Sequence, residues 1–207
     1  MRARDSIFVV THPTADAQVL QDAIANFSTF EIHYIRAPDP ADDNGQIDWI
    51  KPLARRNVFV ALPPMYFGLW RKSVTVRLRA MRCNLLNLIS PTAVIEATAK
   101  IGSGVYVGPA SFVGLNAEIG NCTFIGTKTY LATESKVAAY CSVGDCSFID
   151  VSVRIGAHCV IGNQITIRRG LTIHEFCELS KVGETIVEDL NKETHVLANY
   201  PNKIVTF

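Results

Sequence analysis

The sequence predicts a small α/β domain followed by a parallel β-helix of hexapeptide repeats and a short C-terminal tail. Residues 1–83 alternate apolar strand-like runs with helical patterns, which is typical of a parallel α/β unit. From residue 89 to residue 179 an aliphatic side chain then recurs at every sixth position without an insertion. A period of six fits neither an α-helix nor an alternating strand, and it is typical of a β-helix. We therefore expect domains at residues 1–83, 84–184 and 185–207.

The N-terminal domain is expected to contain three strands and two helices. Short apolar runs bounded by turn-forming residues predict strands at residues 6–11, 29–36 and 57–62. Helical spacing predicts one helix at residues 15–27, and a second, basic helix is expected at about residues 66–82. The favoured interpretation of the basic residues in the second helix is a solvated face: they are Arg71, Lys72, Arg77, Arg79 and Arg82.

The carboxyl ends of these strands are the expected ligand site, because α/β sheets bind ligands at that edge. The candidate substrate-binding residues are Thr11, His12 and Thr14 after the first strand, Asp39 after the second, and Pro63 after the third. The first turn reads THPTADA and contains no glycine, so hydroxyl groups, a helix N-terminus or His12 would have to bind a phosphate there. An ordinary loop role for His12 is an equally good interpretation.

The hexapeptide pattern covers sixteen consecutive positions, and glycine follows the aliphatic residue at eight of them. Glycine lets the backbone turn tightly and approach a neighbouring strand closely, so we expect short strand segments separated by tight turns. The aliphatic positions are Ile89, Ile95, Ile101, Val107, Val113, Ile119, Ile125, Leu131, Val137, Val143, Ile149, Ile155, Ile161, Ile167, Ile173 and Leu179.

One segment, YLATESKVAAYCSV at residues 130–143, keeps this frame but changes its composition. The aliphatic positions persist, whereas Ala132 and Ala138 stand where neighbouring hexads carry glycine, and polar residues lie between them. Because the interior pattern is unchanged, the altered residues are expected to reflect what happens on the outside of the β-helix.

The overall composition favours a cytoplasmic protein without nucleic-acid partners. Hydrophobic residues make up 48% of the 207 residues, the net charge is +1, and no apolar run approaches the roughly 20 residues of a membrane span. The N-terminus lacks the apolar core and cleavage site of a secretory signal. No CxxC motif and no Cys/His cluster with zinc-site spacing occurs, so no metal site is expected; the cysteines are Cys83, Cys122, Cys141, Cys146, Cys159 and Cys177.

The layout, the segment NLISPTAVIEATAKIG (87–102) and the tail ANYPNKIV (198–205) resemble the sialic acid O-acetyltransferase and bacillosamine N-acetyltransferase family of hexapeptide-repeat sugar acyltransferases. The resemblance implies a Rossmann-like N-terminal domain that holds a nucleotide-linked sugar, and a left-handed β-helix with three hexads in each coil. It also implies a homotrimer with acyl-CoA, acetyl-CoA in the first place, as co-substrate between neighbouring β-helices. The acyl-CoA contacts that it implies are Ser142, Gly162, Asn163, Pro201 and Lys203.

With three hexads in each coil, residues 18 positions apart should stack in columns. Cys141, Cys159 and Cys177 are spaced in this way at the inward fifth position of their hexads. We expect a column of buried thiols that pack as small hydrophobic groups, with a redox or metal role as the less favoured alternative.

The main departure from the family lies in the altered segment. The catalytic histidine of the family falls at Thr133, its following acidic residue is present as Glu134, and a second position, often a histidine that contacts the acyl group, falls at Ser142. A threonine hydroxyl is no general base at neutral pH, so Glu134 is the nearest proton acceptor, although an exposed coil edge is an equally good interpretation. His158 is a third catalytic candidate; a surface or packing role is the favoured interpretation of both His158 and His174.

Three functions follow from this reading. The first is an acyl-CoA-dependent N- or O-acyltransferase that acts on a nucleotide-linked sugar in surface-polysaccharide or glycan biosynthesis. The alternative is a non-catalytic relative that binds a sugar nucleotide or acyl-CoA, or an assembly partner, because the family's catalytic histidine and its glycine-rich phosphate turn, which falls on THPTADA, are both altered. A γ-type carbonic anhydrase is set aside, because His158 and His174 lack the spacing of its zinc ligands.

Overall fold

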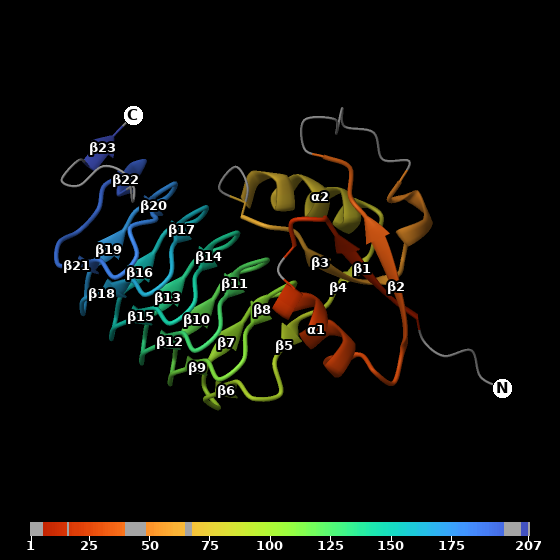
Figure 1. Cartoon of the computed structure of the whole chain (residues 1–207), viewed down its shortest axis with the longest axis horizontal. Coiled ribbons are helices and arrows are strands. Elements are labelled where there is room, and N and C mark those ends of the chain that lie inside the picture. The colour runs from red at the N-terminus through yellow and green to blue at the C-terminus, as the bar shows by residue number, and fades with distance from the viewer. Residues whose placement is uncertain (1–5, 16, 40–48, 65–67, 197–203, 207) are drawn as a thin grey trace.

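A computed structural model of the chain describes residues 6–15, 17–39, 49–64, 68–196 and 204–206. Figure 1 shows a small α/β unit beside an elongated stack of short strands that ends near the C-terminus. Within the described residues, no helix has the length and apolar character needed to cross a membrane.

The N-terminal unit is a four-stranded parallel sheet in the order β2-β1-β3-β4, with helices packed on it. Its core contains Val9, Val10, Phe59 and Val60, which are 3% exposed or less because helices cover both faces of the central strands. This confirms the predicted small α/β part. The elements are β1 (Ser6–Thr11), α1 (Ala17–Asn26), β2 (Glu31–Arg36), the 3₁₀ turn η1 (Lys51–Leu53), β3 (Asn57–Ala61), α2 (Leu69–Ala80) and β4 (Asn84–Leu85).

The remainder of the chain forms a parallel β-helix with three faces, numbered I to III in the order in which the chain reaches them. Face I consists of β5 (Leu88–Ile89), β8 (Tyr106–Val107), β11 (Phe124–Ile125), β14 (Ser142–Val143), β17 (Val160–Ile161), β20 (Glu178–Leu179) and β22 (Thr194–Val196). Face II consists of β6 (Val94–Ile95), β9 (Phe112–Val113), β12 (Tyr130–Leu131), β15 (Phe148–Ile149), β18 (Thr166–Ile167) and β21 (Thr185–Ile186). Face III consists of β7 (Lys100–Ile101), β10 (Glu118–Ile119), β13 (Lys136–Val137), β16 (Arg154–Ile155) and β19 (Thr172–Ile173).

From β5 to β20, each strand pairs with the strand 18 residues away, so one coil contains three hexads, as the resemblance implies. Parallel sheets with this repeat fit a left-handed β-helix. The aliphatic residue of each hexad points inward: Ile125, Leu131 and Ile149 are fully buried. The first coil has no coil above it, and Ile89, Ile95 and Ile101 are accordingly only half-buried.

The turns between the faces are called corner I/II, corner II/III and corner III/I. Glycine is required where successive coils approach most closely: a Cβ on Gly144 would lie 2.6 Å from the carbonyl carbon of Gly162 in the next coil. Each corner also holds a residue in the left-handed region, such as Glu134, His158 and Glu193, all with φ of 61°.

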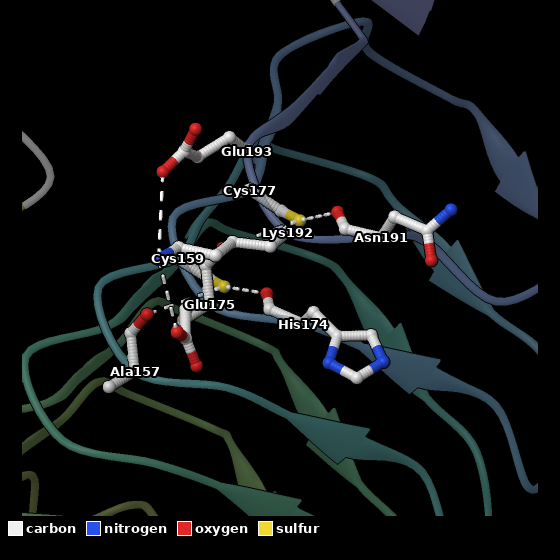
Figure 2. A network of polar contacts seen from close by, with 8 residues as sticks. All are labelled: Ala157, Cys159, His174, Glu175, Cys177, Asn191, Lys192 and Glu193. Atoms are coloured by element: carbon white, nitrogen blue, oxygen red, sulfur yellow. Dashed lines mark hydrogen bonds and ion pairs between the residues drawn. The ribbon is translucent and has the colours of Figure 1, made fainter. Parts of the chain in front are cut away.

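Two corners carry inward polar side chains that bond to the coil below. At corner I/II, the hydroxyl column of Ser111, Thr129 and Ser147 donates to backbone carbonyls 15 residues ahead. At corner III/I, the thiol column of Cys141, Cys159 and Cys177 donates to backbone carbonyls 15, 15 and 14 residues ahead. These three thiols are fully buried, which confirms the predicted column. Figure 2 shows Cys159 and Cys177 directed at the carbonyl oxygens of His174 and Asn191, with sulfur–oxygen distances of 3.0 and 3.1 Å.

The regular spacing ends at the last coil. Thr166 pairs with Thr185, 19 residues ahead, and Glu178 pairs with His195, 17 residues ahead. The final strand β23 (Ile204–Thr206) then runs antiparallel to β22 on face I.

Candidate functional site

A cleft of about 460 Å³ lies where the N-terminal unit meets face I of the β-helix. The N-terminal wall consists of Thr14, Val19, Ala61, Leu62, Pro63 and Pro64, which includes the carboxyl end of β3. The β-helix wall consists of face I and corner I/II: Tyr106, Phe124, Gly126, Ser142, Val143, Gly144, Asp145, Val160, Ile161, Gly162 and Asn163. The cleft is therefore built by both parts of the chain.

The outward side chains of face I change along the cleft from large aromatic residues to the smaller Ser142 and Val160. Tyr106 and Phe124 lie in the first coils against the N-terminal unit: the Tyr106 hydroxyl donates to Asp22 Oδ2 at 2.8 Å, and Phe124 stacks with Phe59 at 6.1 Å. Ser142 follows in the next coil of the same column. The aromatic residues thus hold the two parts of the chain together and leave Ser142 as the first small polar group of the cleft wall.

Corner I/II supplies a wall of backbone and amide groups. The hydroxyl column fixes the three glycines of this wall from inside, because Ser111, Thr129 and Ser147 donate to the carbonyls of Gly126, Gly144 and Gly162 at 2.6, 2.7 and 2.9 Å. On the outside, Asp145 and Asn163 accept backbone N–H groups of the coil above at 2.7 and 2.8 Å. This wall is therefore held by hydrogen bonds on both sides.

A buried arginine lies behind the cleft wall. Arg71 of α2 is fully buried, donates to the carbonyl of Leu62 and to Ser142 Oγ at 3.1 Å each, and stacks 4.1 Å from the ring centre of Phe124. Burial lowers its pKa to about 10, because desolvation disfavours the charged form. The guanidinium therefore remains protonated at neutral pH. The expectation that Arg71 belongs to a solvated helix face is wrong.

A signal for Arg71 is present in the sequence. Arg71 shares the spacing i, i+3, i+4, i+7 with Val74, Thr75 and Leu78, all of which are buried. This spacing defines the packed side of a helix, so a basic residue on it must be buried with partners. Asp145, Tyr106 and Phe124 were likewise missed, because their hexad positions do not show which face is covered by the N-terminal unit.

Five of the predicted binding residues line this cleft. They are Thr14 and Pro63 on the N-terminal wall, and Ser142, Gly162 and Asn163 on the β-helix wall. The two predicted groups, one for substrate and one for acyl-CoA, therefore face one cavity.

The other predicted binding residues lie elsewhere or are not described. Thr11 ends β1, and His12 follows it with Nδ1 2.8 Å from Thr14 Oγ1 and its ring edge against Trp70. Asp39 is exposed beyond β2 and does not line the cleft. Pro201 and Lys203 lie outside the described residues.

Thr133 and Glu134 lie at corner II/III, after β12, and line no part of the cleft. Glu134 borders a smaller hollow of about 270 Å³ together with Asn116, Glu118, Lys136, Ser152 and Arg154. It is exposed, and one carboxylate oxygen accepts the Ser152 hydroxyl at 3.0 Å. The next residue, Ser135, is fully buried, and its hydroxyl has no hydrogen-bond partner within the described part of the chain.

His158 lies at corner III/I in an aromatic stack. Its ring is 5% exposed and lies between Tyr140 and Phe176, with centroids 5.3 and 4.9 Å away and nearly parallel planes. His174 is exposed on the following coil. In the described ranges, no group of three or more His, Cys, Asp or Glu residues is arranged to hold a metal ion.

Comparison with known proteins gives one matching family and several matching structures. The family model of the GMPPB C-terminal domain matches residues 86–196, whereas no curated protein shows a significant match. PerB from Caulobacter crescentus, solved in complex with CoA and GDP-perosamine, is 20% identical, with a TM-score of 0.79 over 92% of each chain.

Two further structures cover nearly the whole length. The acetyltransferase domain of PglB from Neisseria gonorrhoeae, in complex with acetyl coenzyme A, is 19% identical with a TM-score of 0.80, over 98% of this chain and 100% of that one. WeeI from Acinetobacter baumannii is 17% identical with a TM-score of 0.60, over 97% of this chain and 100% of that one. At this identity the similarity shows a shared fold.

Proposed function

The chain belongs to the GMPPB C-terminal domain family, and from this membership and the cleft we propose that it is an acyl-CoA-dependent sugar N- or O-acyltransferase. Its acceptor is a nucleotide-linked sugar of a surface-polysaccharide or glycan pathway, and its donor is acetyl-CoA. The observation that carries this proposal is the cleft itself, which brings Thr14 and Pro63 opposite Ser142, Gly162 and Asn163.

Each wall of the cleft suits one of the two ligands. The N-terminal wall is the carboxyl end of a parallel sheet, where nucleotides bind in α/β units, so we assign it to the sugar nucleotide and treat the unit as Rossmann-like. The β-helix wall offers apolar and backbone surface beside Ser142, which suits a pantetheine arm and thioester. PerB and the PglB domain, which share the fold, were solved with CoA ligands.

The reaction needs a proton acceptor as the sugar amine or hydroxyl attacks the thioester carbonyl. The new bond to the acyl carbon forms, the carbon–sulfur bond breaks, and the proton of the nucleophile ends on the released thiol. We assign the acceptor role to Glu134 and an orienting role to Thr133, because corner II/III carries no imidazole among its described residues. Positioning two bound reactants in one cleft supplies a large part of the acceleration.

Glu134 and the cleft lie on different parts of one chain, so we propose a homotrimer that joins them. Face II carries an outward aromatic column of Phe112, Tyr130 and Phe148, with ring centroids 4.7 and 5.1 Å apart. Tyr130 and Phe148 are 39% and 40% exposed, although stacked aromatic surface favours burial against a partner. We propose that contact through face II brings corner II/III of one chain beside the cleft of its neighbour.

The decisive experiment measures acylated sugar and free CoA together by mass spectrometry, with acetyl-CoA and a panel of nucleotide-linked amino sugars. Equimolar products are expected, and absence of product with every acceptor would contradict the proposal. Glu134→Gln is expected to lower kcat by about 10²-fold or more, because a general base is lost. The matched control is Glu193→Gln, which makes the same change at another left-handed corner, away from the cleft.

A non-catalytic binding protein is the second candidate, because Thr133 stands where the sugar acyltransferases that the sequence resembles have their histidine. Calorimetry distinguishes the two: tight acetyl-CoA binding with no turnover would favour the binding protein. Thr133→His sharpens the test, because an imidazole is the better base near neutral pH and is expected to raise kcat about tenfold or more in an enzyme.

A further inference from the structure

Arg71 is a buried cation whose partners are uncharged. Its guanidinium donates to the carbonyls of Leu62, Cys141 and Tyr140 at 3.1, 3.1 and 3.4 Å, and to Ser142 Oγ at 3.1 Å. No carboxylate lies within ion-pair distance of it in the ranges that the structure describes. Burying a cation without a counter-ion costs free energy, because the cation loses its hydration. This arrangement therefore indicates a role for Arg71 beyond packing.

The direction of the bond to Ser142 follows from the chemistry of the two groups. A guanidinium has donors only, so Arg71 donates and the Ser142 oxygen accepts. The proton of the Ser142 hydroxyl is then free to point away from Arg71. Because Ser142 lines the cleft, this proton is available to an acceptor atom inside it, and a cation on the oxygen makes the hydroxyl a stronger donor.

The backbone holds Arg71 in this position. A Cβ on Gly68, which caps α2 at a φ of 70°, would lie 2.5 Å from the carbonyl oxygen of Tyr140, so the start of α2 sits directly against corner III/I. Arg71 lies one turn further along the helix, and Phe124 covers the guanidinium plane. The helix, the end of β3 and β14 therefore all meet at this side chain.

We propose that Arg71 is a positioning residue that sets the Ser142 hydroxyl as a hydrogen-bond donor to the carbonyl oxygen of the acyl thioester. This inference rests on the proposed function, since that function supplies the thioester. Negative charge develops on the carbonyl oxygen as the nucleophile adds, and a donor fixed before the reaction stabilises it more than the ground state.

The first test needs no ligand. In a Cys146→Ser background, which removes the exposed thiol, the thiol introduced by Ser142→Cys is alkylated with iodoacetamide over a range of pH. With Arg71 present, the midpoint of the pH profile is expected at least about one unit below the ordinary thiol value of about 8.5, because the guanidinium favours the thiolate. Arg71→Met in the same background is expected to remove this shift.

The other titratable groups of the cleft wall, Asp145 and Tyr106, are the same in both proteins and do not produce the difference. Lys72→Met is the matched control, because it removes an exposed positive charge next to Arg71 in sequence. Thermal unfolding verifies that each protein is folded, and Arg71→Gln, which also removes the cation but keeps an amide donor, replaces Arg71→Met where the latter does not fold. Equal pH profiles with and without the Arg71 cation would overturn the proposal, whatever the activity of the protein.

The second test uses turnover of acetyl-CoA. Ser142→Ala is expected to lower kcat by about 10²-fold with little change in KM, as loss of an oxyanion donor does. Arg71→Lys is expected to lower kcat about tenfold in the natural chain and to have no further effect after Ser142→Ala. Equal losses from Arg71→Lys in both backgrounds would assign it a merely structural role. A wild-type protein without turnover would refute the proposed function, and the alkylation profile would then decide the Arg71–Ser142 coupling alone.

Discussion

Two corners of the β-helix follow the same backbone path but use different inward side chains. Corner I/II, which walls the cleft, is held by the hydroxyl column, and corner III/I, which carries the aromatic stack of His158, is held mainly by the thiol column. Both columns donate to backbone carbonyls 14 or 15 residues ahead, yet a thiol is the weaker donor.

A hydroxyl of these columns can also hold a second backbone group by a short hydrogen bond. Ser147 Oγ donates to the carbonyl of Gly162 at 2.9 Å and accepts the N–H of Ile165 at 3.1 Å, so one side chain holds two backbone groups of the next coil. Thr123, which heads the column above Cys141, makes the same pair of bonds. The three thiols below it donate to backbone carbonyls, and their sulfurs also lie near the next thiol or backbone N–H groups of the next coil. The comparison indicates that the stronger clamp is placed where the backbone faces the cleft.

The largest expected effect is a difference in the rate at which cysteines of the two corners react with a thiol reagent. In the folded protein, Cys146 on the outside of corner I/II is exposed, whereas Cys141, Cys159 and Cys177 are fully buried. Buried thiols react only through opening of the structure, so we expect them to be modified at least about 10³-fold more slowly than Cys146. Mass spectrometry after timed exposure to a maleimide measures the ratio. Rapid modification of Cys159 would mean that corner III/I opens readily.

Truncating one side chain in each column should lower the free energy of unfolding by different amounts at the two corners. Ser147→Ala leaves two buried backbone groups without their partner and is expected to lower the free energy of unfolding by about 2–3 kcal/mol. Cys159→Ala removes one weak hydrogen bond and a small volume, for an expected loss of about 1–1.5 kcal/mol. Urea denaturation measures both. Equal losses would show that the second bond of the hydroxyl contributes nothing.

Exchanging the hydroxyl and the thiol between the two columns is a finer test of the difference between the corners. Ser147→Cys replaces a hydroxyl that holds two backbone groups, and we expect a loss of about 1 kcal/mol. Cys159→Ser makes a column member like Thr123, so the change should stay below about 1 kcal/mol. The two effects are compared by denaturation under the same conditions. A larger loss from Cys159→Ser than from Ser147→Cys would reverse the ranking of the corners.

The smallest expected effect on stability concerns an exposed carboxylate between two lysines on face III. The Glu118 carboxylate lies between Lys136 and Lys100, at 3.1 and 3.3 Å, and hydrogen bonds from Lys136 first and Lys100 second lower its pKa. A lowered pKa in the folded state stabilises the fold above the ordinary glutamate pKa, and this contribution is lost as the pH falls through the folded value. The Tm difference between wild type and Glu118→Gln should therefore be small at pH 7 and vanish by about pH 3. A difference that grows on acidification would contradict the ion pairs.

The β-helix was largely predictable, because its interior depends on local spacing alone. Leu131 is buried for the same reason as Ile125 and Ile149: each occupies the aliphatic position of its hexad, and this position recurs sixteen times in the sequence. The buried position of Cys159 follows from the 18-residue spacing of stacked positions. The half-buried state of Ile89 is the exception, since it reflects the end of the stack and not the repeat.

The site was only partly predictable, because it depends on which surfaces meet. Ser142 and Pro63 were expected to bind different ligands, and their shared cleft appears only once the N-terminal unit lies on face I. Arg71 was assigned to solvent because its neighbours in sequence are basic, whereas packing between α2, β3 and β14 decides its burial. Whether Glu134 and Thr133 act in catalysis stays a prediction.

The reversed direction of β23 has a consequence for how the molecules behave at high concentration. A stack of parallel coils ends in unpaired backbone groups, and such an end invites the first coil of another molecule to continue it as a fibre. On face I the last position is taken by a strand that runs antiparallel to β22, so the parallel column is closed there. Strand β23 thus opposes end-to-end polymerisation along this face.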